Sequence, residues 1–130
     1  MTGCLLDTNV VLLAMGAPER LSPAVRAAVK SGPNVLSVVS YWEVTLKAAR
    51  GKLIEVGDPR AWWQAALSDF AATALPLRSD HIAQIWNLEA IHQDPFDRAL
   101  IAQAIVEGLK LVTTDGAIGE YAGERLRVVR

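Results

Sequence analysis

The feature that most constrains this 130-residue chain is an acid placed directly after a short apolar run near its N-terminus. The run Cys4-Leu5-Leu6 predicts a buried strand. Asp7 follows it, and an apolar helical pattern begins at Val10. An acid in this position lies at the carboxyl end of a strand, where open α/β sheets place their ligand crevice. We therefore expect a fold whose site is built at strand ends.

Strands and helices alternate along the rest of the chain. Further apolar runs predict strands over residues 35–39, 73–77, 111–113 and 126–129. Helical patterns start near residues 8, 23, 40, 59, 79, 95 and 116. This alternation predicts an α/β fold of three layers (α/β/α) with a central, mostly parallel sheet and right-handed crossovers. The length predicts a single domain over residues 1–130.

Composition excludes several classes of protein. The net charge of −1 excludes a broad basic surface, so any contact with nucleic acid has to be local. Cys4 is the only cysteine, which excludes an intrachain disulfide and a cysteine zinc site. The sequence has neither a signal-like N-terminus nor an apolar run of about 18 residues, so we expect a cytoplasmic protein without membrane contact.

Four acids follow apolar runs or begin helical patterns that the parallel sheet would bring to one edge. They are Asp7, Glu43, Asp97 and Asp115. Carboxylates gathered at one edge repel one another unless a cation lies among them. Oxygen ligands without a nearby cysteine suit Mg²⁺, with Mn²⁺ as a substitute. The sequence thus predicts an acidic metal site.

Each of these acids also has a structural interpretation. Asp7 and Asp115 are suitable helix caps, and Ser40 with Glu43 fits a capping box. The presence of four acids at one edge of the sheet favours the metal site, because a helix cap needs no second acid at the same edge.

Two acids compete for the site position at residues 94–97. Asp94 precedes Pro95, and proline favours the first helical position, so Asp94 is a natural N-cap. Asp97 lies one turn further on, on the side of Ile101 and Ala104, and can point into the crevice. Asp97 is the preferred site acid, and whether Asp94 is a cap or a site residue stays open.

The motifs of the chain resemble those of PIN-domain ribonucleases, most closely the VapC-type toxins of type II toxin–antitoxin systems. The matching stretches lie in family order and span nearly the whole chain: Leu5-Leu6-Asp7-Thr8-Asn9, residues 40–43, residues 92–104 with Asp94-Pro95-Phe96-Asp97-Arg98, and Leu111-Val112-Thr113-Thr114-Asp115.

The resemblance implies a Mg²⁺-dependent endoribonuclease that cleaves RNA by metal-activated water. It also implies toxicity, control by a small antitoxin and a homodimer. The catalytic and metal-binding residues that it implies are Asp7, Glu43, Asp97 and Asp115, with supporting hydroxyls from Thr8 and Thr114.

Three basic residues are candidate contacts to RNA phosphates. Lys47 and Arg50 follow Glu43 on one helix face, and Arg98 follows Asp97. The alternative for the first two is a Glu43–Lys47 pair on a solvated face.

The histidines and tryptophans are expected at structural or interface positions. We expect surface or capping roles for His81 and His92. Trp63 and Trp86 lie in apolar stripes, so we expect them in the core. Trp62 points to another side of the same helix as Trp63, and we expect it to be an exposed interface anchor.

Two other functions compete with the nuclease. One is a non-catalytic module of the same fold that binds RNA or protein and uses the acids as helix caps. The other is a different α/β enzyme, against which the chain lacks the G-x-G-x-x-G and G-x-S-x-G motifs.

Overall fold

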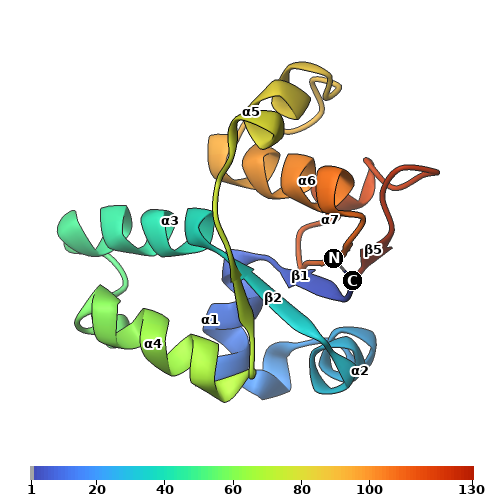
Figure 1. The fold of residues 1–130 in the computed structure, drawn as a ribbon. Coiled ribbons are helices and arrows are strands. Elements are labelled where there is room, and N and C mark those ends of the chain that lie inside the picture. The colour runs from blue at the N-terminus through green and yellow to red at the C-terminus, as the bar shows by residue number, and fades with distance from the viewer. Residues whose placement is uncertain (1) are drawn as a thin grey trace.

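The computed structural model describes residues 2–130 and contains a five-stranded sheet of order β3-β2-β1-β4-β5 (Figure 1). Every neighbouring pair of strands is parallel. The strands are β1 Cys4–Leu6, β2 Asn34–Ser37, β3 Thr73–Leu75, β4 Lys110–Val112 and β5 Val128–Val129. The predicted α/β fold with a parallel sheet is confirmed.

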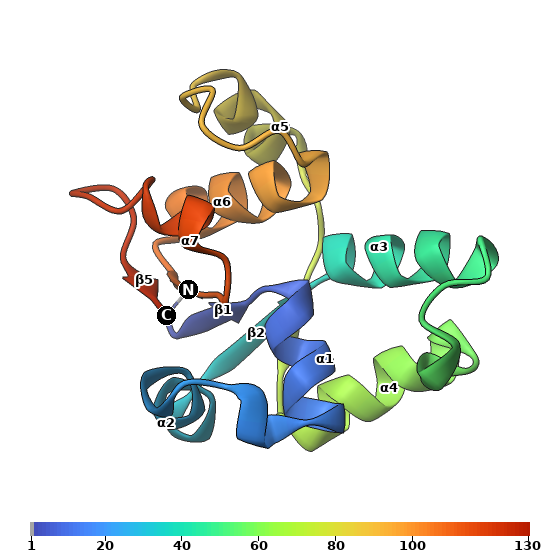
Figure 2. The same ribbon diagram turned by 180° about the vertical axis from the view of Figure 1, so that it is seen from behind.

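Helices cover both faces of the sheet (Figures 1 and 2). One face carries α1 Thr8–Gly16, α2 Pro23–Ser31 and α4 Pro59–Asp69, and the other carries α5 Ser79–Trp86, α6 Pro95–Glu107 and α7 Gly116–Gly119. Helix α3, Val38–Ala49, extends from the end of β2. Two short 3-10 turns, Pro18–Arg20 and Ile54–Val56, complete the described elements.

The core lies in two clusters, one on each face of the sheet. Along β1, Leu5 packs with Leu100 and Leu111 on the α6 side, and Leu6 packs with Val10 and Trp63 on the other side. Successive strand side chains point to opposite faces, so an unbroken apolar run fits a strand covered on both.

Local sequence signals fix the ends of several helices. The Ser22 hydroxyl accepts a hydrogen bond from the Val25 N–H at 3.1 Å, and Pro23 is the first residue of α2. Helix α6 ends at Gly108, whose φ of 68° is accessible to glycine at little cost.

The boundary between β2 and α3 differs from the prediction. The strand ends at Ser37, and the Ser37 hydroxyl accepts a hydrogen bond from the Val39 N–H at 3.0 Å as the N-cap of α3. Residues 38 and 39 are therefore helical rather than extended. The predicted capping box of Ser40 and Glu43 is wrong, because the helix has already begun two residues earlier.

Two of the tryptophan predictions are also wrong. Trp62 is only 6% exposed, and Trp86 is 90% exposed. Helix α5 turns His81 and Ile85 toward α6, so Trp86 and Ile82, one turn apart on another face, point outward. Trp63 is buried as predicted and stacks on Tyr41 at a ring-centroid distance of 5.0 Å.

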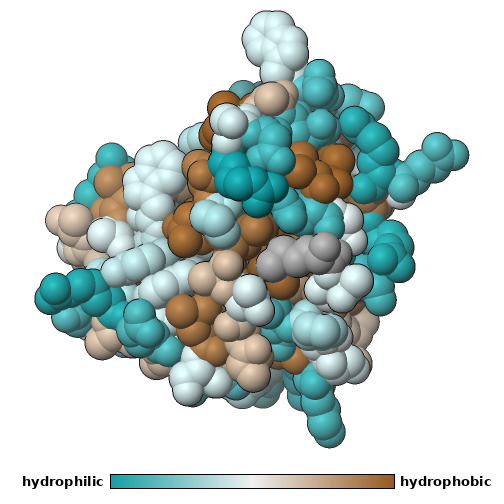
Figure 3. All heavy atoms as spheres, in the orientation of Figure 1, coloured by the Kyte–Doolittle hydropathy of each residue, from teal (hydrophilic) through white to brown (hydrophobic). Residues whose placement is uncertain are grey.

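The face seen in Figure 3 has hydrophobic side chains mainly toward its centre and hydrophilic ones at its projecting rim. Edge strand β3 crosses this face in Figure 1. Among residues 2–130, the helices are all too short or too polar to span a membrane.

Candidate active site

The candidate site lies where the strand order of the sheet reverses direction. From the central strand β1 the chain builds outward through β2 and β3 on one side, and later through β4 and β5 on the other. Asp7 follows β1, and Thr113 to Asp115 follow β4, its neighbour. In open α/β sheets the crevice at this reversal is the usual ligand site.

A cleft of about 280 Å³ opens at this position. It brings together the four predicted site acids, the two predicted hydroxyls and one of the three predicted basic residues. Its lining residues are Asp7, Thr8, Asn9, Glu43, Lys47, Asp94, Asp97, Thr114 and Asp115.

Asp7 is a buried carboxylate that is held on both oxygens. Oδ1 accepts a hydrogen bond from the Val10 N–H at 2.8 Å, which caps α1, and Oδ2 accepts one from the Thr113 hydroxyl. Burial raises the pKa of Asp7 above its usual value, and these hydrogen bonds oppose the rise. The carboxylate is thus fixed in place while its charged form is disfavoured.

Glu43 has no capping role and projects from the second turn of α3. It is 6% exposed. Oε2 lies 2.6 Å from the Lys47 ammonium, whereas Oε1 is buried and has no hydrogen-bond partner within residues 2–130. A buried carboxylate oxygen without a hydrogen-bond partner lowers the stability of the fold, so this atom is a candidate ligand for a cation.

Asp97 is the third residue of α6 and is the most strongly perturbed acid of the cleft. Burial and the neighbouring charge of Asp94 raise its pKa to about 7, and His92 opposes the rise. A carboxyl group with this pKa exchanges its proton near neutral pH.

Asp94 is the N-cap of α6. Its Oδ1 accepts hydrogen bonds from the Phe96 N–H at 2.8 Å and the Asp97 N–H at 3.3 Å. Asp94 also lines the cleft. The residue therefore caps the helix and faces the site at the same time, so the two roles left open by the sequence are compatible.

Asp115 caps α7 through Oδ1, which accepts a hydrogen bond from the Ala117 N–H at 2.8 Å. Its Oδ2 lies 2.8 Å from Nε2 of His92. Burial raises the pKa of Asp115, but the hydrogen bonds from His92 and Ala117 outweigh it, so the net shift is downward.

Sequence reasoning missed two residues of the site. His92 is partly buried, with Nε2 at 3.2 Å from Asp97 Oδ2 and 2.8 Å from Asp115 Oδ2, so its predicted surface position is wrong. The hydrogen bond to Asp115 raises the pKa of His92, and burial opposes the rise. Thr113 accepts a hydrogen bond from the Asp115 N–H at 2.9 Å and donates its own to Asp7. The sequence signal for His92 is that it begins the matching stretch of residues 92–104, two residues before Asp94.

The two predicted hydroxyls tie the first turn of α1 to its neighbours. The Thr8 hydroxyl donates to Ser40 Oγ at 2.9 Å. The Asn9 side-chain amide donates to Thr114 Oγ1 at 2.7 Å. Both contacts hold residues that line the cleft.

The predicted basic residues differ in their surroundings. Lys47 forms the i,i+4 pair with Glu43, as the alternative interpretation expected. Arg50 is exposed at the end of α3. Arg98 instead donates to main-chain carbonyls, those of Ile85, Glu89 and His92. These contacts favour a role for Arg98 in holding the loop after α5.

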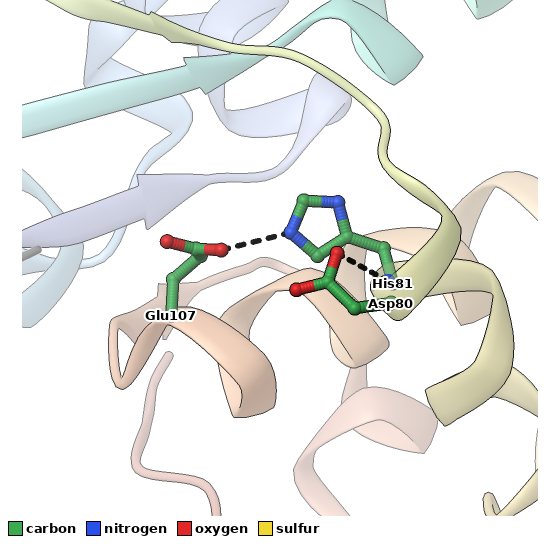
Figure 4. Close-up of side chains that lie close together, drawn as sticks. All are labelled: Asp80, His81 and Glu107. Carbon is green, nitrogen blue, oxygen red and sulfur yellow. Dashed lines mark hydrogen bonds and ion pairs between the residues drawn. The ribbon is translucent and has the colours of Figure 1, made fainter.

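A second cluster of titratable groups lies outside the cleft and consists of Asp80, His81 and Glu107 (Figure 4). His81 is buried, and its Nε2 lies 2.9 Å from Glu107 Oε2. Arg78 donates to both carboxylates, at 3.0 Å to Asp80 and 2.5 Å to Glu107, so the cluster already contains a cation. Nδ1 of His81 accepts the Arg78 N–H at 3.0 Å, so the predicted capping role is confirmed and the predicted surface position is wrong.

The residues of the cleft fit a hard divalent cation. The donor set is made of carboxylate oxygens, which Mg²⁺ and Mn²⁺ prefer. The buried Glu43 Oε1 lacks a hydrogen-bond partner among the described residues, and burial together with the neighbouring charge of Asp94 raises the pKa of Asp97. A bound cation would give Glu43 Oε1 a partner and would offset the repulsion between the carboxylates.

Comparisons with known proteins agree with this geometry. The sequence profile of the PIN domain matches residues 4–124. Ribonuclease VapC22 of Mycobacterium tuberculosis is 28% identical over 126 residues, which is 96% of each chain.

Two solved structures show the same fold at low sequence identity. A chain of VapBC2 from Rickettsia felis, bound to a DNA fragment from its promoter, has a TM-score of 0.70 at 15% identity, with 100% of both chains covered. A chain of FitAcB from Neisseria gonorrhoeae has a TM-score of 0.68 at 20% identity, with 98% of this chain and 96% of that one covered.

Proposed function

Because this chain belongs to the PIN domain family, we propose that it is a metal-dependent endoribonuclease and the toxin of a type II toxin–antitoxin pair. The similarity to Ribonuclease VapC22 supports the ribonuclease activity. The likeness to chains of VapBC and FitAcB complexes supports a partner protein. We further propose that residues 1–130 form a single PIN domain and act in the cytoplasm.

The observation that carries the proposal is the buried Oε1 of Glu43, which has no hydrogen-bond partner among residues 2–130 and lies in a cleft shared with Asp7, Asp97 and Asp115. The competing module, in which the acids are only helix caps, accounts for Asp7 and Asp115. It does not account for the buried Oε1 of Glu43, because Glu43 caps nothing and its pair with Lys47 uses only Oε2. A metal site accounts for all four.

We propose that Asp7, Glu43, Asp97 and Asp115 hold Mg²⁺, for which Mn²⁺ can substitute. The bound ion would supply positive charge against the scissile phosphate and lower the pKa of an attacking water. Asp7 would be kept in position by the Thr113 hydroxyl and the Val10 N–H. Asp97, with a pKa of about 7 before the ion binds, would release a proton when it does.

The basic residues at the rim would provide a local grip on RNA. Lys47 and Arg50 lie on the α3 face that follows Glu43, and Lys47 lines the cleft. With a net charge of −1, the chain has little general attraction for a polyanion, so such local contacts matter more.

The proposed antitoxin would inhibit by entering the acidic cleft with a cationic side chain. Arginine suits this role because its planar fork matches carboxylates bidentately. An apolar segment of the antitoxin would lie in a second cleft of about 430 Å³, which is lined in part by Leu12, Met15 and Trp62. The toxin itself would be a homodimer. A complex in which the partner leaves the four acids open to solvent would contradict this mode of inhibition.

The experiment that tests the proposal is incubation of purified protein with mixed RNA, with and without Mg²⁺. Wild type should cleave only with the ion, and Asp7→Asn should abolish cleavage while the circular dichroism spectrum is unchanged. Asp80→Asn is the matched control, since it neutralises an acid outside the cleft. Cleavage by Asp7→Asn at saturating Mg²⁺ would remove Asp7 from the mechanism. Metal-independent RNA binding without cleavage by wild type would favour the binding module.

A further inference from the structure

We propose that His92 is a positioning residue whose fixed Nε2–H donor holds Asp97 and Asp115 together for a divalent cation. The part that concerns the cation rests on the proposed function. The part that concerns the hydrogen bonds of the imidazole rests on the geometry of the chain alone.

The hydrogen-bond network assigns the tautomer of the ring. Nδ1 of His92 lies 3.1 Å from the main-chain nitrogen of Asp94 and accepts its N–H. A main-chain N–H can only donate, so Nδ1 carries a lone pair and the proton of the neutral ring lies on Nε2. Nε2 is therefore a donor and has no lone pair for a metal ion.

That single N–H lies between two carboxylates from different elements. Nε2 donates a hydrogen bond to Asp115 Oδ2, after β4, at 2.8 Å, and it lies 3.2 Å from Asp97 Oδ2, in α6, which is an ion-pair distance. These three atoms lie within 4.8 Å of one another. The imidazole thus lies between two negative groups that would otherwise repel, and it keeps their oxygens within 4.8 Å of each other.

The main chain around His92 is also held firmly. Its N–H donates to the Tyr121 hydroxyl at 2.8 Å, and its carbonyl accepts from Arg98 at 3.3 Å. With Nδ1 anchored by Asp94, the ring has both its position and its orientation set by neighbours. Hydrogen-bonded partners of metal-binding carboxylates commonly have this role, and their loss costs about 10- to 100-fold in metal affinity.

The chain contains a matched control in its other histidine. His81 also accepts a main-chain N–H at Nδ1, from Arg78, and its Nε2 contacts a carboxylate, Glu107 (Figure 4). Arg78 also pairs with Glu107, so the carboxylate at His81 already has a cation, whereas His92 contacts two acids that line the acidic cleft. The same substitution at the two histidines therefore separates an effect on the cleft from a general effect on the fold.

The first test needs no metal. Two histidines give two sets of imidazole ¹⁵N signals, which His81→Gln assigns. At pH 8 in chelator, His92 should show a protonated Nε2 and an unprotonated Nδ1. A neutral ring with its proton on Nδ1 and none on Nε2 would overturn the proposal, because Nε2 would then be a potential ligand rather than a donor.

The second test measures Mn²⁺ affinity directly at pH 8 by electron paramagnetic resonance of the free ion. His92→Ala should bind Mn²⁺ about 10- to 100-fold more weakly than wild type. His92→Gln keeps an amide N–H near the position of Nε2 and should recover most of the affinity, and His81→Gln should bind as wild type does. Equal or tighter binding by His92→Ala would overturn the positioning role while leaving the proposed function intact. A wild-type protein that neither binds Mn²⁺ nor cleaves RNA would overturn both.

Discussion

Neutralising Asp97 should stabilise the metal-free protein at neutral and higher pH. Its pKa of about 7 lies far above the ordinary value of 3.8, so the folded state keeps the proton that the unfolded chain has lost. The free energy of unfolding therefore falls as pH rises from about 4 to about 7, and the full cost is present above pH 7. In Asp97→Asn this cost is absent, because the amide is neutral at every pH.

The expected magnitude is modest. A shift from 3.8 to about 7 corresponds to about 4 kcal/mol in a fully dry site. The Asp97 side chain is 21% exposed, and solvent screening reduces the figure to about 1–2 kcal/mol. Loss of a favourable charge in the first turn of α6 removes up to about 1 kcal/mol. A net gain of about 1 kcal/mol should raise Tm by about 3–5 °C in a chain of this length.

Thermal melts in chelator at pH 8 and pH 5 measure this effect. Asp97→Asn should melt higher than wild type at pH 8, and the difference should shrink at pH 5, where the wild-type carboxyl is protonated. Mg²⁺ at a hundredfold excess over its Kd should stabilise wild type by about 2.7 kcal/mol and the variant by less.

A matched control is Asp80→Asn, which also removes a first-turn acid but should lower Tm, since Arg78 lowers the pKa of Asp80. The reasoning is refuted if Asp97→Asn melts lower than wild type at pH 8 in chelator and both proteins gain equally from Mg²⁺.

Three further outcomes follow from the structure. Lys47→Gln combined with Arg50→Gln should reduce the slope of log K against log salt for RNA binding by about one to two, whereas an unchanged slope would mean that neither side chain contacts phosphate. Gln103→Leu should lower the free energy of unfolding in urea melts by about 1–3 kcal/mol, because the buried Ser37 hydroxyl loses its acceptor. Calorimetry at pH 6.5 in buffers of different ionisation enthalpy should show proton release when Mn²⁺ binds, from Asp97 and His92, whose pKa values are both raised, and binding without proton release would contradict these shifts.

The order of the elements was predictable because local signals determine it. Short apolar runs became strands, and the caps Ser22, Asp58 and Asp94 each begin a helix. The sequence did not place the end of β2, because Val38 and Val39 suit a strand as well as a first helical turn. Only the Ser37 cap, a single side-chain contact, decides between the two.

The gathering of the four acids was predictable from topology, whereas their environment was not. Parallel strands bring their carboxyl ends to one edge, which places Asp7 and Asp115 together. His92 reaches Asp115 across 23 residues of sequence from a loop without periodicity, so nothing local indicates the contact. The exposure of Trp86 could not be predicted either. Helix α5 buries the face that carries His81, because both ring nitrogens of His81 have hydrogen-bond partners in the interior, and Trp86 lies on another face.

The sequence posed caps and metal ligands as alternatives, but a carboxylate has two oxygens and about four lone-pair sites. Asp7 and Asp115 each give Oδ1 to a helix N–H and direct Oδ2 elsewhere. Capping fixes the carboxylates in advance, which is what a metal site requires of its ligands. Asparagine is itself a good N-cap, so Asp7→Asn should remove the charge and keep the cap, whereas Asp7→Ala should also lose about 1 kcal/mol of stability. Equal Tm values for the two variants in chelator would show that the cap at Asp7 contributes nothing, and the fixed geometry of the cleft would then need another cause.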